Sequence, residues 1–151
     1  MKEKAKRVLL IVLLTVISFS GTCFERDTRV SISQSSNPPT FVLSGNGFLQ
    51  DFIISGPFSN LEETNQPVKG EGRVAWKLHS KEHRRVYELS PIAYGNVPVW
   101  ATQTIPEQGA PKPLEEGKIY LAWGRLEEAN FRVFCFTMKT GQVIKVDCRD
   151  R

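Results

Sequence analysis

Apolar and polar residues alternate with a period of two along much of the chain, which is the pattern of β-strands with one buried face. The clearest case is 73–79, where Val74, Trp76 and Leu78 share one face and mostly polar residues share the other. Shorter runs bounded by Gly, Pro or Asn occur at 30–32, 41–44, 48–55, 86–89, 92–94, 97–104, 131–138 and 142–148. The pattern predicts an all-β chain.

Residues 114–123 predict a corner that leads into a buried strand. Gly117 supplies the turn between Leu114 and Tyr120. Alternation places three apolar side chains on one face, which we assign to the core: Ile119, Leu121 and Trp123. Tyr120 has the opposite parity, so we expect its ring to lie against the corner. Its hydroxyl is then expected to hydrogen-bond to the backbone a few residues upstream, as in the tyrosine corner of β-sandwiches.

Two glycine-containing turns predict hairpins. The first, at 45–47, contains Asn-Gly between two β-rich runs, which is a strong short-range hairpin signal. The second is a three-residue loop at 139–141. Its register places these residues on one apolar face: Phe134, Phe136, Met138, Ile144, Val146 and Cys148. Between the predicted strands, 56–72 is expected to be a long surface loop, and 105–113 a Pro/Gly connection.

The three cysteines leave one without a partner. The register of the second hairpin puts Cys135 and Cys148 on opposite faces of the sheet. A slip of one residue would place them across from each other. Cys23 could also pair with either, so the pairing stays open.

The N-terminus predicts export. Residues 1–7 are basic, 8–19 are mainly apolar and 18–22 are rich in small residues, which is the layout of a secretory signal peptide covering 1–22. A retained membrane anchor is the alternative. Cys23 follows directly and resembles the acylated cysteine of bacterial lipoproteins, although Ser20-Gly21-Thr22 departs from that family's usual box. We expect 23–40 to form a tether and leading edge strand, and 41–151 a single domain.

The charge distribution argues against nucleic-acid binding. The net charge is +4. Residues 1–22 hold four basic residues and one acidic residue, which gives +3, and the remainder holds 16 basic and 15 acidic residues, which gives +1. A nearly neutral domain lacks the cationic face that phosphate backbones require.

With Trp76 on an early strand and Leu114, Gly117 and Tyr120 at a late corner, residues 41–146 resemble an immunoglobulin-like or fibronectin type III β-sandwich. The chain is also similar to bacterial secreted or lipoprotein-type proteins of unknown function in three segments, 38–47, 92–98 and 114–120. These resemblances imply a β-sandwich behind a signal peptide and a location outside the cell or in the cell envelope. They imply no activity.

The two histidines belong to an H-x-x-E-H motif formed by His79, Glu82 and His83, which is the zinc signature of inverzincin proteases. That chemistry needs both imidazoles on one helical face. Here the strand period puts His79 at a strand end and His83 in a turn, and basic residues surround them: Lys81, Arg84 and Arg85. We therefore predict no metal site. No G-x-S-x-G motif is present, so neither an enzyme nor a cofactor is expected.

A binding or structural role is the remaining expectation. Trp100, beside Pro98, is the aromatic residue that we expect to be exposed, and sandwich domains usually bind through loops at one end. The predicted binding residues are Trp100, Pro106, Gln108 and Lys112. The expected partner is an envelope protein or a glycan, and an alternative function is that of a small ligand- or carbohydrate-binding protein. Membrane contact is expected only through the N-terminal segment or a lipid on Cys23. We expect the basic residues of 73–85 to form a solvated charged face, and a site for anionic lipids or polymers is the alternative.

Overall fold

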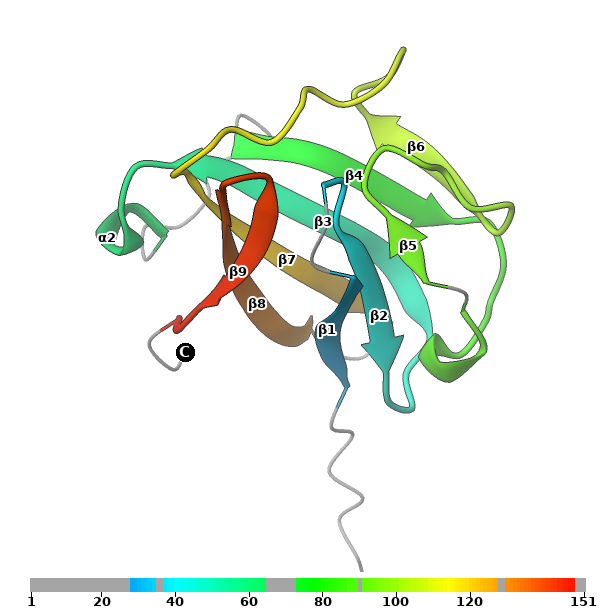
Figure 1. Cartoon of the computed structure of the whole chain (residues 1–151). Helices are drawn as coiled ribbons and strands as arrows, with labels where there is room; N and C mark the ends of the chain where they lie inside the picture. The colour runs from blue at the N-terminus through cyan, green and yellow to red at the C-terminus, as the bar shows by residue number, and fades with distance from the viewer. Residues whose placement is uncertain (1–27, 35–36, 65–72, 90, 128–129, 149–151) are drawn as a thin grey trace, which may run out of the picture.

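The computed structural model describes residues 28–34, 37–64, 73–89, 91–127 and 130–148 (Figure 1). Two antiparallel sheets form a β-sandwich, which confirms the predicted all-β architecture. The smaller sheet has the order β1-β2-β5, with β1 (Arg29–Gln34), β2 (Thr40–Ser44) and β5 (Ile92–Ala93). The larger has the order β6-β4-β3-β7-β8-β9, with β3 (Leu49–Phe58), β4 (Val74–Ser80), β6 (Ala101–Ile105), β7 (Ile119–Leu126), β8 (Asn130–Lys139) and β9 (Gln142–Val146). The predicted leader and Cys23 lie outside the described residues.

The core lies between the two sheets and is rich in aromatic residues. Phe41 of β2 packs against Phe52 of β3 with ring centroids 5.5 Å apart, and Trp76 of β4 meets Tyr94 at 5.3 Å. Trp76 and Leu78 are fully buried, as the alternation in 73–79 predicts. The predicted leading strand also exists, since β1 pairs with β2 and Val30 reaches the core. Among the described residues, no helix is long and apolar enough to cross a membrane.

The corner before β7 confirms the predicted tyrosine hydrogen bond. The backbone N–H of Glu115 donates to the Tyr120 hydroxyl over 2.9 Å, and the Tyr120 ring stacks on Phe136. Gly117 has a φ of 71°, the left-handed conformation that favours glycine, and Leu114 is buried beside the corner. Burial raises the pKa of the Tyr120 hydroxyl, which keeps it neutral and available for this bond.

We expect Tyr120→Phe to lower the free energy of unfolding by about 1–2 kcal/mol, because the partly buried Glu115 N–H loses its acceptor while the ring packing is kept. Chemical denaturation of the variant measures this change. A midpoint equal to that of the original chain would show that the bond contributes nothing.

The face assigned to Ile119, Leu121 and Trp123 was wrong. These residues do share a face, but it is the outer face of the six-stranded sheet, where they form a second cluster with Phe58 and Cys135. The face toward the main core carries Tyr120, Ala122 and Leu126. Both faces of β7 are mainly apolar, so alternation alone does not reveal which of them meets the other sheet.

The turn at 45–47 does not close a hairpin. β2 and β3 flank it but belong to different sheets, so the turn carries the chain from one layer to the other. Gly47 permits a close crossing, because a Cβ there would lie 2.5 Å from Leu126 Cδ1. The Asn-Gly signal located a turn and misassigned the pairing of its flanking strands.

The C-terminal hairpin exists, but its predicted register is wrong by one residue. Lys139 pairs with Gln142 around a two-residue turn, in which Thr140 and Gly141 both have positive φ, rather than around a three-residue loop. This turn places Cys135 opposite Val146 and on one face with Ile144 and Val146. Cys135 forms a disulfide with Cys148, with Cα atoms 5.6 Å apart, which resolves the open pairing.

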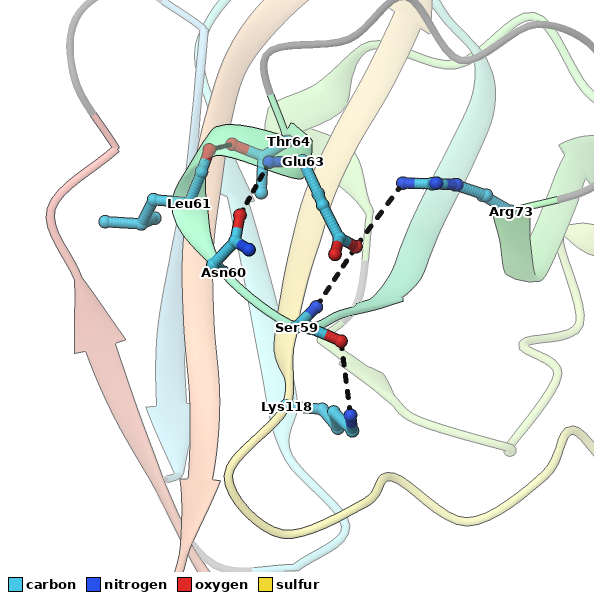
Figure 2. A network of polar contacts seen from close by, with 7 residues as sticks. All are labelled: Ser59, Asn60, Leu61, Glu63, Thr64, Arg73 and Lys118. Carbon is cyan, nitrogen blue, oxygen red and sulfur yellow. Dashed lines mark hydrogen bonds and ion pairs between the residues drawn. The ribbon is translucent and has the colours of Figure 1, made fainter.

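Two other predicted segments differ from the structure. Residues 56–58 belong to β3, and the short helix α2 (Leu61–Thr64) follows, whereas 65–72 lie outside the described residues. Figure 2 shows what holds α2: Asn60 Oδ1 accepts the N–H of Glu63, and Glu63 Oε2 accepts the N–H of Ser59. Asn60 thus caps the start of α2, and Glu63 binds the residue before the cap. The predicted strand at 86–89 is instead a 3₁₀-helix, η2 (Val86–Glu88).

Candidate functional site

Trp100 is a core residue, so the expectation that its ring is exposed was wrong. Only 4% of Trp100 is exposed, and it packs in the main cluster between the sheets. The cause is a turn in which the N–H of Ala101 donates to the carbonyl of Pro98. The turn directs Trp100 inward and leaves Val99, at 90% exposure, in the solvent position.

The structure separates Trp100 from the other three predicted binding residues, which share one connection. Trp100 precedes β6 and Pro106 follows it, so the length of a five-residue strand separates them. Gln108 and Lys112 are exposed on the connection that follows. That connection is fixed through its backbone, because the Gln103 Nε2 group donates to the carbonyls of Pro106 and Gly109 over 2.7 and 2.8 Å.

Two buried core residues complete this attachment. Trp76 Nε1 donates to Gln103 Oε1 over 2.8 Å, and the Tyr94 hydroxyl donates to the carbonyl of Lys112 over 2.9 Å. Burial raises the pKa of Tyr94, so its hydroxyl remains a donor. These bonds tie the connection at 105–113 to the core through the carbonyls of Pro106, Gly109 and Lys112, while most of its side chains are exposed. That its residues bind a partner stays a prediction.

The outer face of the six-stranded sheet presents a different aromatic residue, Trp123. Its indole Nε1 donates to the Ser55 hydroxyl of β3 over 3.0 Å, and the ring is half-buried. Ile53, its cross-strand neighbour on β3, is buried, and Lys77 on β4 is the other neighbour of Ile53. The hydrogen bond to Ser55 thus fixes the indole ring of Trp123 beside the buried Ile53, and part of the ring is exposed to solvent.

Next to this row lies a charged row across the same three strands. Asp51 on β3 pairs with His79 on β4 and with Arg125 on β7. His79 Nδ1 lies 2.9 Å from Asp51 Oδ1, and Arg125 Nη2 lies 2.5 Å from Asp51 Oδ2. The second contact is an ion pair whose angles are not those of a hydrogen bond. The carboxylate is 1% exposed, whereas its two partners are about half exposed.

We call the polar and aromatic residues of these two rows, together with Ser55, the outer-face site; its members are Asp51, Ser55, Lys77, His79, Trp123 and Arg125. The Arg125 guanidinium offsets the charge of the buried Asp51 carboxylate, and the His79 ring lies against its other oxygen. The side chains of this site that are exposed to solvent, wholly or in part, are the indole of Trp123 and the nitrogen-bearing groups of Lys77, His79 and Arg125. A planar aromatic beside hydrogen-bond donors can stack on a sugar ring and bind its oxygens, or contact a peptide.

The two histidines of the H-x-x-E-H motif have separate partners. His79 contacts Asp51, whereas His83 Nδ1 lies 2.7 Å from Glu127 Oε1 and its ring stacks on Phe48. His79 lies on β4 and His83 in the turn after it, as the strand period predicts. In the part of the chain that the structure describes, no group of three or more His, Cys, Asp or Glu residues could hold a metal ion. That the histidines bind no metal stays a prediction.

Sequence reasoning missed the outer-face site because β3 pairs with β4 and β7, which are distant in the chain. One available signal was Asp51 itself, an acidic residue within the apolar run 48–55. Aspartate is seldom fully buried unless it is paired. Its position therefore predicts a partner on a neighbouring strand, although not which one.

The fold and the site together describe a β-sandwich with an aromatic and cationic outer face. Comparison with protein-family models, with curated proteins and with solved structures finds no match to the chain. The case for a function therefore depends on the geometry.

Proposed function

We propose that the chain is an exported, non-catalytic β-sandwich module of the bacterial cell envelope that binds its partner through the outer-face site. The observation that carries the binding proposal is Trp123, a partly exposed indole fixed by Ser55. Indoles fixed in this way lose little conformational entropy on binding, which favours stacking on a sugar ring. An envelope glycan is accordingly the favoured partner, and an envelope protein is the alternative.

The strand order supports assignment to the immunoglobulin-like class. In that class, strands A, B and E share one sheet and strands C, F and G share the other. The chain groups β1, β2 and β5 in one sheet and β3, β7 and β8 in the other. Tyr120 near the start of β7 corresponds to the tyrosine corner near the start of strand F. On this assignment, β4, β6 and β9 are additional strands of the larger sheet, and β6 and β9 form its two edges.

The disulfide supports export, because such bonds persist mainly in oxidising compartments. Cys135 and Cys148 use two of the three cysteines, so Cys23 is not needed as a disulfide partner and is available for acylation. The basic-then-apolar start is the second support.

Export predicts a shortened chain. Intact-mass spectrometry of the protein recovered from a producing cell should show loss of the first 20 to 22 residues, with an added lipid mass if Cys23 is acylated. Recovery of the unprocessed Met1 form from the cytosol would contradict export.

Trp123→Ala is expected to weaken capture of the envelope glycan by about tenfold or more, since a central aromatic anchor carries much of the energy of a small interface. Trp123→Phe keeps a ring for stacking and should retain part of the capture. Pull-down on insoluble envelope polysaccharide measures both.

The matched control is Gln108→Ala, in the connection first predicted to bind, which should capture like the original chain. Circular dichroism must show that all three variants are folded. Full capture by Trp123→Ala, or loss of capture by Gln108→Ala alone, would contradict the location of the site.

A further inference from the structure

Four segments meet at the end of the sandwich from which the chain enters β1. Arg29, the first residue of β1, pairs with Ser44 at the end of β2, and the turn at 45–47 leads directly to Phe48. Phe48 bridges to Arg85, and the N–H of Lys81 donates to the carbonyl of Trp100. Figure 1 shows the start of β1 beside the arrowhead of β2 at the lower edge of the sandwich. We call this the proximal end.

The proximal end carries apolar side chains that the fold does not use. Val99 is 90% exposed, Tyr87 57% and Val97 40%. Val99 lies next to Trp100 in the turn that meets Lys81, and Tyr87 follows Val86, whose N–H donates to the carbonyl of Gly47. The remaining large apolar side chain exposed in the described parts of the chain is Ile144, on the edge strand β9. All three residues of the proximal end lie in connections at the end of the large sheet where β3 and β6 begin and β4 ends. Several exposed apolar side chains at one end of a domain indicate an interaction surface.

Basic residues border these side chains. Lys81, Arg84 and Arg85 are all exposed in the turn that follows β4. Arg85 lies 5.1 Å above the Phe48 ring, and Arg84 is paired with Glu82. Glu82 offsets the charge of Arg84. We expect apolar contact to supply the larger part of any binding, and Lys81 and Arg85 to interact with phosphates.

The attachment point restricts what the proximal end can reach. Five residues separate Cys23 from Arg29. Even fully extended, such a segment spans only about 20 Å. If the proposed export leaves the chain anchored by a lipid on Cys23, the proximal end is held within that distance of a bilayer. A retained leader, whose apolar run ends at Phe19, would hold it within about 35 Å.

We propose that the proximal end rests on the surface of an anionic phospholipid bilayer, with Val99, Val97 and Tyr87 at the boundary between headgroups and acyl chains. Apolar side chains bordered by Lys and Arg are what such an interface binds. In this proposal the outer-face site of the large sheet has no role in membrane contact. The inference depends on the anchoring part of the proposed function and not on the outer-face site.

The test compares two tryptophan reporters in the full chain reconstituted into vesicles that contain phosphatidylglycerol and lipids with brominated acyl chains. Val99→Trp places an indole at the proximal end, and Ile144→Trp places one on β9. The emission of each is corrected by subtracting the emission of the unsubstituted chain. We expect loss of most of the added emission for Val99→Trp and almost none for Ile144→Trp, because bromine quenches only indoles near the acyl chains.

Replacing phosphatidylglycerol with phosphatidylcholine should reduce the quenching of Val99→Trp, since the cations lose their anionic partners. Chain that sediments with vesicles but shows equal quenching at both positions, or none at Val99→Trp, would overturn the docking and leave anchoring and the outer-face site intact. Chain that does not sediment with vesicles would overturn the docking and the anchor together. Trp123→Ala should leave the quenching of Val99→Trp unchanged, which separates this result from a failure of glycan binding.

Discussion

Trp100→Ala is expected to lower the free energy of unfolding by about 3–5 kcal/mol, which is the usual cost of removing a buried aromatic side chain. The side chain is 4% exposed and lies in the main core cluster, so its removal leaves a cavity that the surrounding strands can fill only in part. Urea or thermal denaturation of the purified variant measures the change.

The matched control is the neighbouring residue in the same turn. Val99 is almost fully exposed, so Val99→Ala should leave the midpoint of unfolding nearly unchanged. If both variants unfold like the original chain, Trp100 is not part of the core, and the loop site first predicted around it regains its basis.

Cys148→Ser is the second change with a large expected effect. The disulfide joins residues 13 positions apart, and closing a loop of that size restricts the unfolded chain. We expect the variant to lose about 2–4 kcal/mol of stability, the range typical for such a bond. Denaturation with and without dithiothreitol provides the measurement: the reductant should destabilise the original chain and leave the variant almost unaffected.

Cys23→Ser serves as the control, because Cys23 takes no part in the Cys135–Cys148 bond. It should keep the stability of the original chain and its sensitivity to the reductant. An original chain whose unfolding is insensitive to the reductant would contradict a stabilising role for the bond.

Sequence patterns predicted local structure well where one strand face is polar. In β4, the small Ala75 and the charged Lys77 alternate with Val74, Trp76 and Leu78 and make the buried face evident, and Trp76 and Leu78 are buried. β7 lacks this contrast, so its outward Trp123 was assigned to the core. The difference lies in whether the second face carries apolar side chains of its own, which happens when a second cluster covers it.

Strand pairing on either side of a turn was harder to predict from the sequence than the turn itself. The register of the C-terminal hairpin depends on whether its loop has two or three residues. The two-residue loop requires a positive φ at Thr140, which is 51°, and threonine is not a residue from which a positive φ is expected. The turn at 45–47 was located correctly, but whether it closes a hairpin or crosses between sheets depends on which distant strands compete for β3. Burial of Trp100 likewise depends on the direction of a turn.

The outer-face site could be predicted only in part for the same reason. Asp51, His79 and Arg125 come from three strands whose pairing is long-range, and Trp123 and Ser55 are 68 positions apart in the chain. A sequence shows that a carboxylate in an apolar strand needs a partner. It does not show the sheet order that supplies one.

The most direct test of the proposed binding surface is a nuclear magnetic resonance titration of the isotope-labelled chain with solubilised envelope glycan. The indole N–H groups of Trp76, Trp100 and Trp123 give separate signals, and Trp76 and Trp100 lie in the core. We expect the signals of the Trp123 indole and of the backbone amides of Ser55 and Arg125 to shift with added glycan, while those of the other two indoles and of Gln108 do not. Shifts confined to Gln108 and its neighbours, with an unchanged Trp123 signal, would contradict it.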